Sequence, residues 1–396
     1  MLNSDHQQLL FAMLRDLIRV PSPSGREREC ALLTQKYMRR LDFDDVNSDI
    51  FGNIIGLMNF GGSGPTLLMD AHLDHAGVSD VERWTHYPYG GDLAEDRIWG
   101  RGSLDNKGAL AAMMMAAHLA SLNPAGLRGR IYVVGTVFNK LMEGVSSEGL
   151  VEMCRPDYVI IGEASDHLIM HGQRGRTEIF LETHGRTALT AMPCFGVNAV
   201  EKMIRLTNEI EREFSNLPKH PLLGEVSMEL TEINSSPYIE VNVIPDFCRA
   251  RFDFRFPVGR SKSEIISRIR ASISAMIAVD GSFEADVYLP LKEFRCYTGV
   301  SISTDAYWPA WLLDENHPLV MAACRGLSQV GLPSNKSVYP FSTNASYYAG
   351  VLGLPTIGFG PRPIALYHQV DENIATSDLL DLCLGYYGLI RSVLAA

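Results

Sequence analysis

Hydrophobic residues recur along this chain with two periods, one helical and one typical of buried strands. From Ser4 to Val20, leucine, methionine and isoleucine return every third or fourth residue, and a stretch rich in proline and serine follows. This spacing predicts an amphipathic helix with a sharp end, and a second helix is predicted from Arg26 to Leu41. Short, continuous apolar runs further along predict buried strands at Leu67–Met69, Arg130–Val137 and Tyr158–Glu163. Because helical segments separate these strands, we expect an α/β fold whose mixed sheet is sandwiched by helices.

The pattern changes near residue 177. Two helices are predicted at Asn198–Phe214 and Lys262–Ile277, between strand-like stretches, and this α+β arrangement is typical of a small inserted domain. We therefore predict a discontinuous first domain of residues 1–176 and 290–396, and an inserted domain of residues 177–289. A length of 396 residues agrees with two domains, because a single core rarely grows beyond about 250–300 residues.

Composition and charge narrow the classes of function. The net charge of −11 argues against nucleic acid as a partner, because binding phosphates needs a basic face. No apolar run is long enough to span a membrane, and the N-terminus lacks the pattern of a signal peptide. The seven cysteines are scattered, odd in number and without a CxxC pair, so neither a disulfide framework nor a thiolate zinc site is indicated. We expect a cytoplasmic protein with reduced thiols.

The most informative stretch lies between residues 67 and 108. The apolar strand ends in His72 and Asp74, whose alternation places both side chains on the same side of the strand. About thirty residues later, a glycine-flanked turn carries Asp105 and leads directly into a helical run. A carboxylate at such a junction, beside a histidine at a strand end, suits a borderline cation such as zinc.

The HxD pair of His72 and Asp74, followed by the GRGxxDxKG segment Gly100–Gly108, resembles the M20 family of metallopeptidases and aminoacylases. Within it, the chain is most similar to the branch that holds acetylornithine deacetylase, succinyl-diaminopimelate desuccinylase and YgeY-like hydrolases. The segments Asn242–Pro245 and Asp253–Pro257 match that family's NxIP and DxRxP strands, so the likeness covers nearly the whole chain.

The resemblance implies a zinc-exopeptidase-like domain with an inserted lid that usually forms a homodimer contact. Family members hold two metal ions, usually zinc, and hydrolyse an amide in a small amino-acid derivative. The resemblance assigns His72, Asp105 and Glu163 to one ion, and Asp105, His368 and the second Glu of a Glu-Glu pair to the other. The first Glu of that pair is the general base, and Asp74 orients His72.

This chain departs from the family where the catalytic groups belong. A gapless alignment puts Asn139 and Lys140 at the Glu-Glu pair, and Leu189 at the lid histidine that steadies the oxyanion. Asn139 cannot accept a proton from water, and Leu189 can neither donate a hydrogen bond nor carry charge. Loss of a general base alone costs about 10²–10⁴ in rate, so ordinary hydrolysis should be crippled.

Lys140 suggests a site with one metal ion rather than two. Its ammonium would repel a second cation and pair with Asp105, and burial could also lower its pKa so that it serves as a base or nucleophile. We expect zinc, with manganese or cobalt as alternatives. A shifted register remains open, in which Glu143 or Glu148 returns a carboxylate to the site.

Four further residues are candidate substrate contacts: Arg174, Asn242, Arg255 and Asn344. Lid Asn and Arg side chains hold substrate carboxylates in the resembling family, but Arg255 within DFRFP could equally form a structural ion pair. The substrate itself is not readable from the sequence. We expect an enzyme acting on an amide or acyl group with chemistry altered from hydrolysis, such as transacylation, cyclisation, lyase chemistry or slow hydrolysis. The alternative is a catalytically inactive homologue that serves as a binding or regulatory subunit.

Overall fold

The computed structural model describes residues 2–237 and 241–395, which fold into two compact units. The first unit comprises the chain up to Gln173, Glu293–Ile302 and the chain from Leu312 onward. The second comprises Arg174–Lys292 and Ser303–Trp311. The last of these segments falls in the part of the sequence that we assigned to the first domain. It belongs to the second unit because Tyr307 and Trp308 pair with Thr177 and Arg176 there.

The first unit is built on a mixed sheet in which the central strands are parallel and the edge is antiparallel. Within the described residues its strands, in spatial order, are β1 (Asp45–Ser48), β2 (Ile54–Gly61), β6 (Gly129–Thr136), β3 (Thr66–His72), β7 (Tyr158–Ile161), β18 (Thr356–Gly358), β8 (Ile169–Gln173) and β16 (Trp311–Leu312), with β17 (Lys336–Tyr339) beside β8. A smaller sheet of the same unit joins β4 (Asp92–Ala94), β5 (Arg97–Trp99) and β19 (Asn373–Ala375). Strand β13 (Leu291–Arg295) pairs with β14 (Ser301–Asp305), and each of these two strands has residues in both units. Every residue of β3 is buried, as a strand covered on both faces must be.

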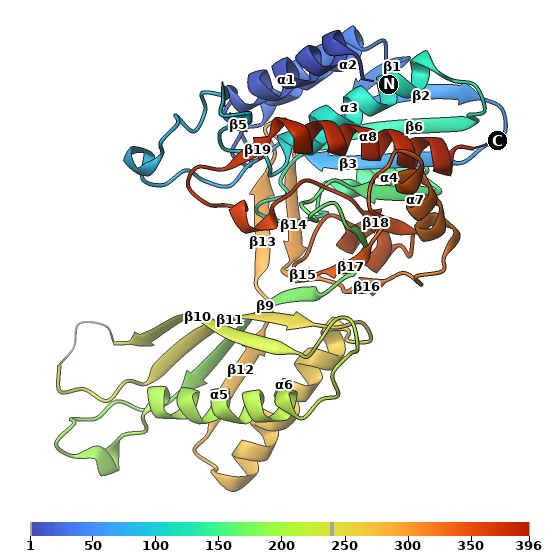
Figure 1. Cartoon of the computed structure of the whole chain (residues 1–396). Helices are drawn as coiled ribbons and strands as arrows, with labels where there is room; N and C mark the ends of the chain where they lie inside the picture. Colours follow the sequence, from blue (N-terminus) through green and yellow to red (C-terminus); the bar gives the residue numbers. More distant parts are fainter. Residues whose placement is uncertain (1, 238–240, 396) are drawn as a thin grey trace. The chain divides into compact units, whose positions relative to one another are not determined.

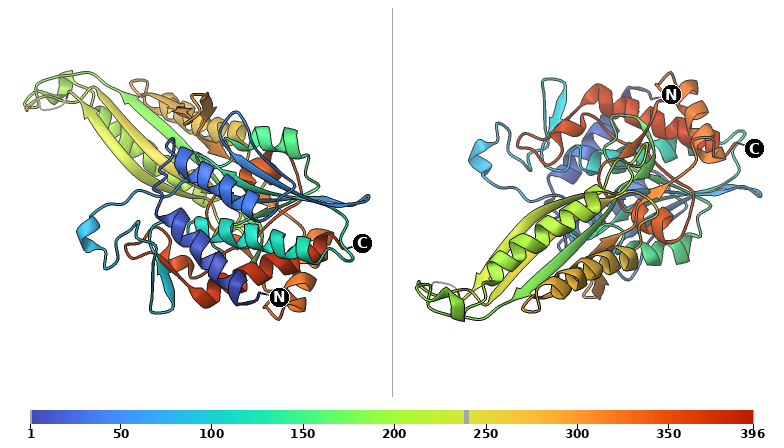
Figure 2. Two further views of the ribbon diagram at one scale, coloured as in Figure 1. Left: turned by 90° about the horizontal axis from the view of Figure 1, so that it is seen from above. Right: turned by 90° about the horizontal axis from the view of Figure 1, so that it is seen from below.

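Helices cover both faces of this sheet (Figure 2). One face carries α1 (Ser4–Ile18), α2 (Arg28–Arg40), α3 (Lys107–Leu122), α7 (Pro318–Gln329) and α8 (Thr376–Val393), and the other carries α4 (Ser147–Cys154). Helix α3 is apolar all round because it lies between the sheet and its neighbours α1 and α8, and the Met113–Met115 run is part of this core. The predicted α/β sandwich with a mixed sheet is therefore confirmed.

Short helical turns complete the chain: η1 (Val81–Arg83), η2 (Pro193–Phe195), η3 (Ser346–Val351) and η4 (Ile364–Leu366). In the described part of the chain, no helix has the length and apolar character needed to cross a membrane. The predicted N-terminal helix, Ser4 to Val20, ends two residues early at Ile18, before the proline-rich stretch.

The second unit is an antiparallel sheet with two helices on one face (Figure 1). Its strands, in spatial order, are β10 (Ser227–Ser236), β11 (Phe247–Phe256), β9 (Gly175–His184) and β12 (Glu284–Tyr288), and β15 (Tyr307–Trp308) also pairs with β9. Burial alternates strictly along β11, so Phe252, Phe254 and Phe256 face the helices α5 (Ala199–Ser215) and α6 (Lys262–Val279). The α+β character predicted for the inserted region is thus observed.

Candidate metal centre

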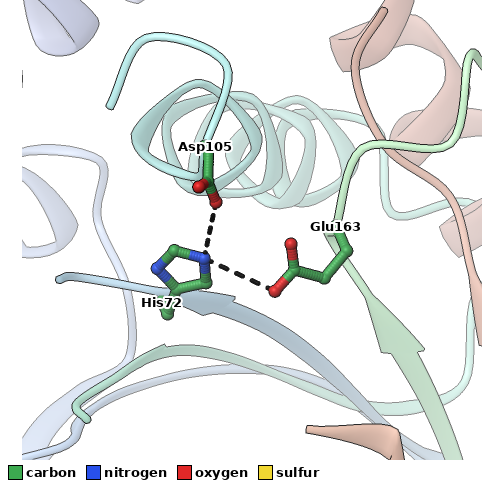
Figure 3. A group of neighbouring side chains, drawn as sticks. All are labelled: His72, Asp105 and Glu163. Atoms are coloured by element: carbon green, nitrogen blue, oxygen red, sulfur yellow. Dashed lines mark hydrogen bonds and ion pairs between the residues drawn. The ribbon is translucent and has the colours of Figure 1, made fainter. Parts of the chain in front are cut away.

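The strand β3 delivers His72 to the carboxyl edge of the sheet, where two carboxylates meet it (Figure 3). The Nε2 atom of His72 lies 3.0 Å from Oδ1 of Asp105 and 3.4 Å from Oε1 of Glu163. All three side chains are buried, and we call them the buried triad. The other ring nitrogen, Nδ1, lies 2.7 Å from the backbone oxygen of Asp74. Donation from Nδ1 to this oxygen leaves Nε2 free to ligate a metal.

The turn that carries Asp105 is held in place by Glu372, a residue for which we predicted no role. One oxygen of this buried carboxylate accepts hydrogen bonds from the backbone N–H groups of Gly102, Leu104 and Asp105, at 3.0, 2.9 and 3.0 Å. Its other oxygen pairs with Arg101 at 2.5 Å. Nothing in the sequence links residues so far apart, although a glutamate just before a strand that lines the turn is the sort of residue to suspect.

Lys140 reaches the same carboxylate from a different loop. Its Nζ atom lies 2.8 Å from Oδ1 of Asp105 and donates to the hydroxyl of Tyr367 at 3.2 Å. The Tyr367 hydroxyl in turn donates a hydrogen bond to Oε2 of Glu163. Tyr367 was not among our candidates, although its position directly before His368 could have suggested it.

Asp74 positions Lys140 more directly than it positions His72. Its two carboxylate oxygens accept hydrogen bonds from the backbone N–H groups of Asn139, at 3.2 Å, and Lys140, at 2.8 Å. Ser24 donates to the same carboxylate at 2.6 Å. His72 Nδ1 lies 3.5 Å from Oδ1, so its shorter contact is with the backbone oxygen of Asp74.

Glu27 holds the backbone of Phe138, the residue directly before Asn139. Its Oε1 atom accepts from the backbone N–H of Phe138 at 3.2 Å and of Gly25 at 2.9 Å. Its Oε2 atom is buried and has no hydrogen-bond partner within the described part of the chain. Burial, reinforced by the charge of Asp74, raises the pKa of Glu27 to about 7.

The side chain of Asn139 belongs to a buried polar network. Its amide nitrogen donates to Oδ1 of Asn344 at 3.0 Å, and the N–H of Gly144 donates to the same oxygen at 2.7 Å. The amide nitrogen of Asn344 donates to Asp70 at 3.1 Å and to Thr136 at 3.0 Å. Asn344, a predicted substrate contact, is thus engaged on both ends of its amide by the fold.

His368 lies at the edge of the centre. Its side chain is 48% exposed, and its Nε2 atom is 2.8 Å from Oδ2 of Asp105. This distance suits an ion pair, yet Oδ2 has no properly oriented hydrogen-bond donor among the described residues. A buried carboxylate oxygen left in this state is compatible with ligation of a cation.

The charges of the centre shift its titrations strongly. Burial and Lys140 both lower the pKa of His72, but Glu163 and Asp105 outweigh them and raise it to about 10. Burial would likewise lower the pKa of Lys140, but Asp105 and Glu163 raise it above its ordinary value. The lowered lysine pKa that we expected from burial is therefore not found, because two carboxylates face the ammonium. Burial raises the pKa of Asp105, yet Lys140 and the two histidines hold it well below its usual range.

The buried triad fits a divalent ion. One ligand atom from each residue lies within 4.8 Å of the others, and one nitrogen with two carboxylate oxygens is a donor set that zinc accepts. The negative charge of the two carboxylates favours the protonated form of His72. A bound metal cation would balance the same negative charge. Of the alternative ligands, Glu143 accepts a hydrogen bond from Ser342 at 3.0 Å and Glu148 is exposed on α4, and neither belongs to the ligand group of the buried triad.

Two predicted substrate contacts lie in the second unit and interact with it. Arg174 donates to the backbone oxygens of Glu225, at 2.6 Å, and Arg255, at 3.3 Å. Arg255 forms an ion pair with Asp253 at 2.5 Å, which is the structural alternative considered for it. Their contact with a substrate stays a prediction.

Asn242 and Leu189 lie in segments that face each other in the same unit. Leu189 forms an isolated bridge with Val243, and its side chain is 48% exposed. Asn242 adopts a left-handed backbone conformation with φ of 64°. Its role toward a substrate also stays a prediction.

The second unit holds another group of potential ligands, on β9 and β12. Glu182, His184 and Asp286 also bring ligand atoms within 4.8 Å of one another, and we call them the exposed triad. The side chains of His184 and Asp286 are 32% and 69% exposed. Glu182 pairs across the sheet with Arg249 and accepts a hydrogen bond from Tyr288.

Known proteins are similar to this chain in sequence or in fold. The chain is 29% identical over 398 residues to the uncharacterized protein YgeY of Escherichia coli K12, covering 99% of this chain and 96% of that protein. The aminopeptidase PepT of Bacillus cereus superposes with a TM-score of 0.76 at 17% identity, over 98% of both chains. The YXEP protein of Bacillus subtilis, a dinuclear metal binding peptidase from the M20 family, superposes with a TM-score of 0.72 at 13% identity, over 99% of both chains.

The family model described as peptidase family M20/M25/M40 matches residues 68–392. This stretch includes the buried triad, Lys140 and His368, and the strands and turns that position them. By sequence and by fold, the chain belongs to the M20/M25/M40 peptidase family.

Proposed function

We propose that this protein is a metal-dependent enzyme that acts on an amide or acyl group of a small amino-acid derivative by chemistry other than ordinary hydrolysis. One divalent ion is held by the buried triad, and the ammonium of Lys140 replaces the charge of a second ion. The observation that carries this proposal is the contact of 2.8 Å between Lys140 Nζ and Asp105 Oδ1.

Lys140 excludes a second ion by charge and by position. A protonated amine has no lone pair with which to ligate a metal. Two cations near the same oxygen repel each other strongly in a buried site, where water screens them poorly. The raised pKa keeps this ammonium charged throughout the physiological range. One ion on His72, Asp105 and Glu163 is therefore the occupancy that the charges favour.

The same residues restrict the chemistry. A bound divalent ion would supply Lewis acidity toward a carbonyl oxygen. Lys140, as a fixed positive charge, can stabilise negative charge that develops on that group, but it cannot serve as a base. Asn139 is no base either, and its amide is bound to Asn344. Without a group to activate water, reactions in which the substrate brings its own nucleophile or leaving group are favoured: transacylation, cyclisation or lyase chemistry.

Zinc is the ion we propose, because imidazole and carboxylate ligands suit it, with manganese or cobalt as alternatives. All seven cysteines are free thiols, which supports a cytoplasmic location. We further propose a homodimer through residues 177–289, with Arg174, Asn242 and Arg255 available to a substrate carboxylate. The homodimer and the substrate contacts of these three residues rest on the family resemblance and on the chemistry of the side chains.

The decisive experiment measures metal content per chain and then turnover. Protein purified without added metal, and after loading with zinc, should hold one ion. Lys140→Met should keep the ion but lose at least about 10²-fold in turnover on a panel of N-acyl amino acids, N-carbamoyl amino acids and dipeptides, the size of effect typical for a group that stabilises developing charge. Lys336→Met, which removes an exposed lysine from the same unit, is the matched control and should be unaffected.

Each contrary result has a distinct meaning. Two ions in the wild-type chain would show that another carboxylate completes a dinuclear site. Undiminished turnover of Lys140→Met would remove this residue from the mechanism. No ion under any condition would favour the inactive homologue, and binding partners should then be sought.

A further inference from the structure

Tyr367 occupies the middle of the centre without any role assigned to it so far. Its hydroxyl donates to Oε2 of Glu163 and accepts from Nζ of Lys140 at 3.2 Å. Tyr367 therefore connects Glu163, the member of the buried triad that follows β7, to the ammonium of Lys140, which lies in the loop after β6.

The ring of Tyr367 cannot easily move away from this place. It stacks on the ring of His368, with centroids 4.6 Å apart, and on that of Phe341, at 5.7 Å. The ammonium of Lys140 also lies 5.0 Å from the centroid of the ring. Stacking against two rings restricts the plane of a phenol, so the position of its hydroxyl is set by the neighbours as well as by its hydrogen bonds.

The two carboxylate oxygens of Glu163 have different partners. Oε1 is the atom 3.4 Å from Nε2 of His72, and it belongs to the ligand group of the buried triad. Oε2 is bound to Tyr367. A hydrogen bond to Oε2 orients the carboxylate and favours ligation of a metal through Oε1.

We propose that Tyr367 is a positioning residue that limits this centre to one metal ion. It restricts Glu163 to ligation through Oε1 and, together with Lys140, fills the space beside Asp105 and His368 in which a second ion would bind. This inference rests on the proposed one-ion function. It adds a second barrier against binding of another ion, beside the charge of Lys140. Removing the ammonium alone leaves the hydroxyl in place, so substitution of Lys140 is not sufficient to admit a second ion.

A set of four proteins tests this barrier: the wild type, Tyr367→Phe, Asn139→Glu with Lys140→Glu, and the triple variant that combines all three changes. Phenylalanine keeps the stacking and removes only the hydroxyl. Metal per chain is measured after loading with Mn²⁺, and the electron paramagnetic resonance spectrum distinguishes a spin-coupled ion pair from isolated ions. Tyr37→Phe is the matched control, because it removes a hydroxyl that donates to Asp16 at 2.6 Å elsewhere in the same unit.

We expect one ion in the first three proteins and a coupled pair in the triple variant only. A pair already present in Asn139→Glu with Lys140→Glu would overturn the role of Tyr367, as would a folded triple variant that stays at one ion. A wild-type chain that binds no ion would overturn the proposed function itself, and this result differs from the other two.

A second measurement keeps the inference falsifiable if the triple variant does not fold. In the Co²⁺-loaded single variant Tyr367→Phe, the freed Oε2 of Glu163 can join the ion and raise its coordination number. The visible absorption of Co²⁺ weakens when tetrahedral coordination expands, so we expect a fall relative to the wild type and to Tyr37→Phe. An unchanged spectrum would show that the hydroxyl does not restrict Glu163.

Discussion

The buried triad and the exposed triad combine the same three residue types, a histidine, an aspartate and a glutamate. In both, the ligand atoms lie within 4.8 Å of one another. They differ in their surroundings, because the buried triad is shielded from water while Asp286 of the exposed triad is 69% exposed. A ligand group shielded from water binds a cation more strongly, since solvent does not compete for it or screen its charge.

The supporting contacts differ as much as the burial. In the buried triad, His72 is oriented by a backbone oxygen and the Asp105 turn by three N–H bonds to Glu372. In the exposed triad, His184 contacts Asp286 at 3.1 Å and has no comparable framework among its described contacts. The comparison teaches that residue types alone do not make a metal centre, because orientation and exclusion of water come from the rest of the fold.

The largest effect is expected when the histidine of each triad is removed. His72→Ala should abolish metal binding, a loss beyond the 10- to 100-fold range of outer contacts, because it deletes a ligand. His184→Ala is the matched control and should leave metal content unchanged. Inductively coupled plasma mass spectrometry of both variants after zinc loading would check this. Equal losses in the two variants would break the distinction between the triads.

The next effect concerns the framework rather than the ligands. Glu372→Ala leaves Arg101 buried without its partner and three N–H groups without an acceptor, so it should cost about 3–5 kcal/mol of stability. Asp286→Ala, at the exposed triad, should change stability by less than about 0.5 kcal/mol. Urea unfolding of both variants measures the difference. A small loss for Glu372→Ala would mean that the Asp105 turn holds its shape without this carboxylate.

The pH dependence of stability should reveal the buried Glu27. Its pKa is raised from 4.5 to about 7 in the folded chain, so the folded state keeps the proton where the unfolded state has released it. Stability should therefore fall as the pH rises from about 4.5 to 7, by roughly 3 kcal/mol in all. Glu27→Gln should flatten this part of the profile, which unfolding measured at several pH values would show. An identical slope in the variant would assign the dependence to other groups.

The smallest effect is expected at His368. It contacts Asp105 but lies outside the buried triad, so His368→Ala should retain one ion with affinity lowered by no more than about 10-fold. A metal titration against a chromophoric chelator, run beside His72→Ala, gives the comparison. Loss of the ion from His368→Ala would show that His368 is itself needed to hold the ion and does not lie outside its ligand set.

Much of the fold was predictable because it depends on local patterns. The period of apolar residues predicts α1 nearly to its ends, and the continuous run before His72 predicts a fully buried strand. The inserted region was recognisable from its change of pattern. The later segment Ser303–Trp311 was not recognisable as part of it, because this segment joins the second unit through pairing with β9, a contact between residues more than a hundred positions apart.

The candidate site divides in the same way. Short motifs single out His72 and Asp105, and the structure brings them to hydrogen-bonding distance with Glu163 close by. Motifs did not reveal Glu372, Glu27 or Tyr367, whose functions depend on partners distant in sequence. The sequence also suggested that burial lowers the pKa of Lys140. Burial has this effect only where no carboxylate lies near the ammonium.

The family, the α/β architecture and the residue types of the centre can be predicted from the sequence alone, because they follow from short-range patterns and from motif spacing. The contacts among those residues follow from the tertiary structure. The proposed role of Lys140 as a fixed charge depends on the distance from its ammonium to Asp105, and the proposed restriction of Glu163 to one ligating oxygen depends on its hydrogen bond from Tyr367. Coulomb energies and hydrogen bonds depend on distance in space, and the folded chain alone sets those distances.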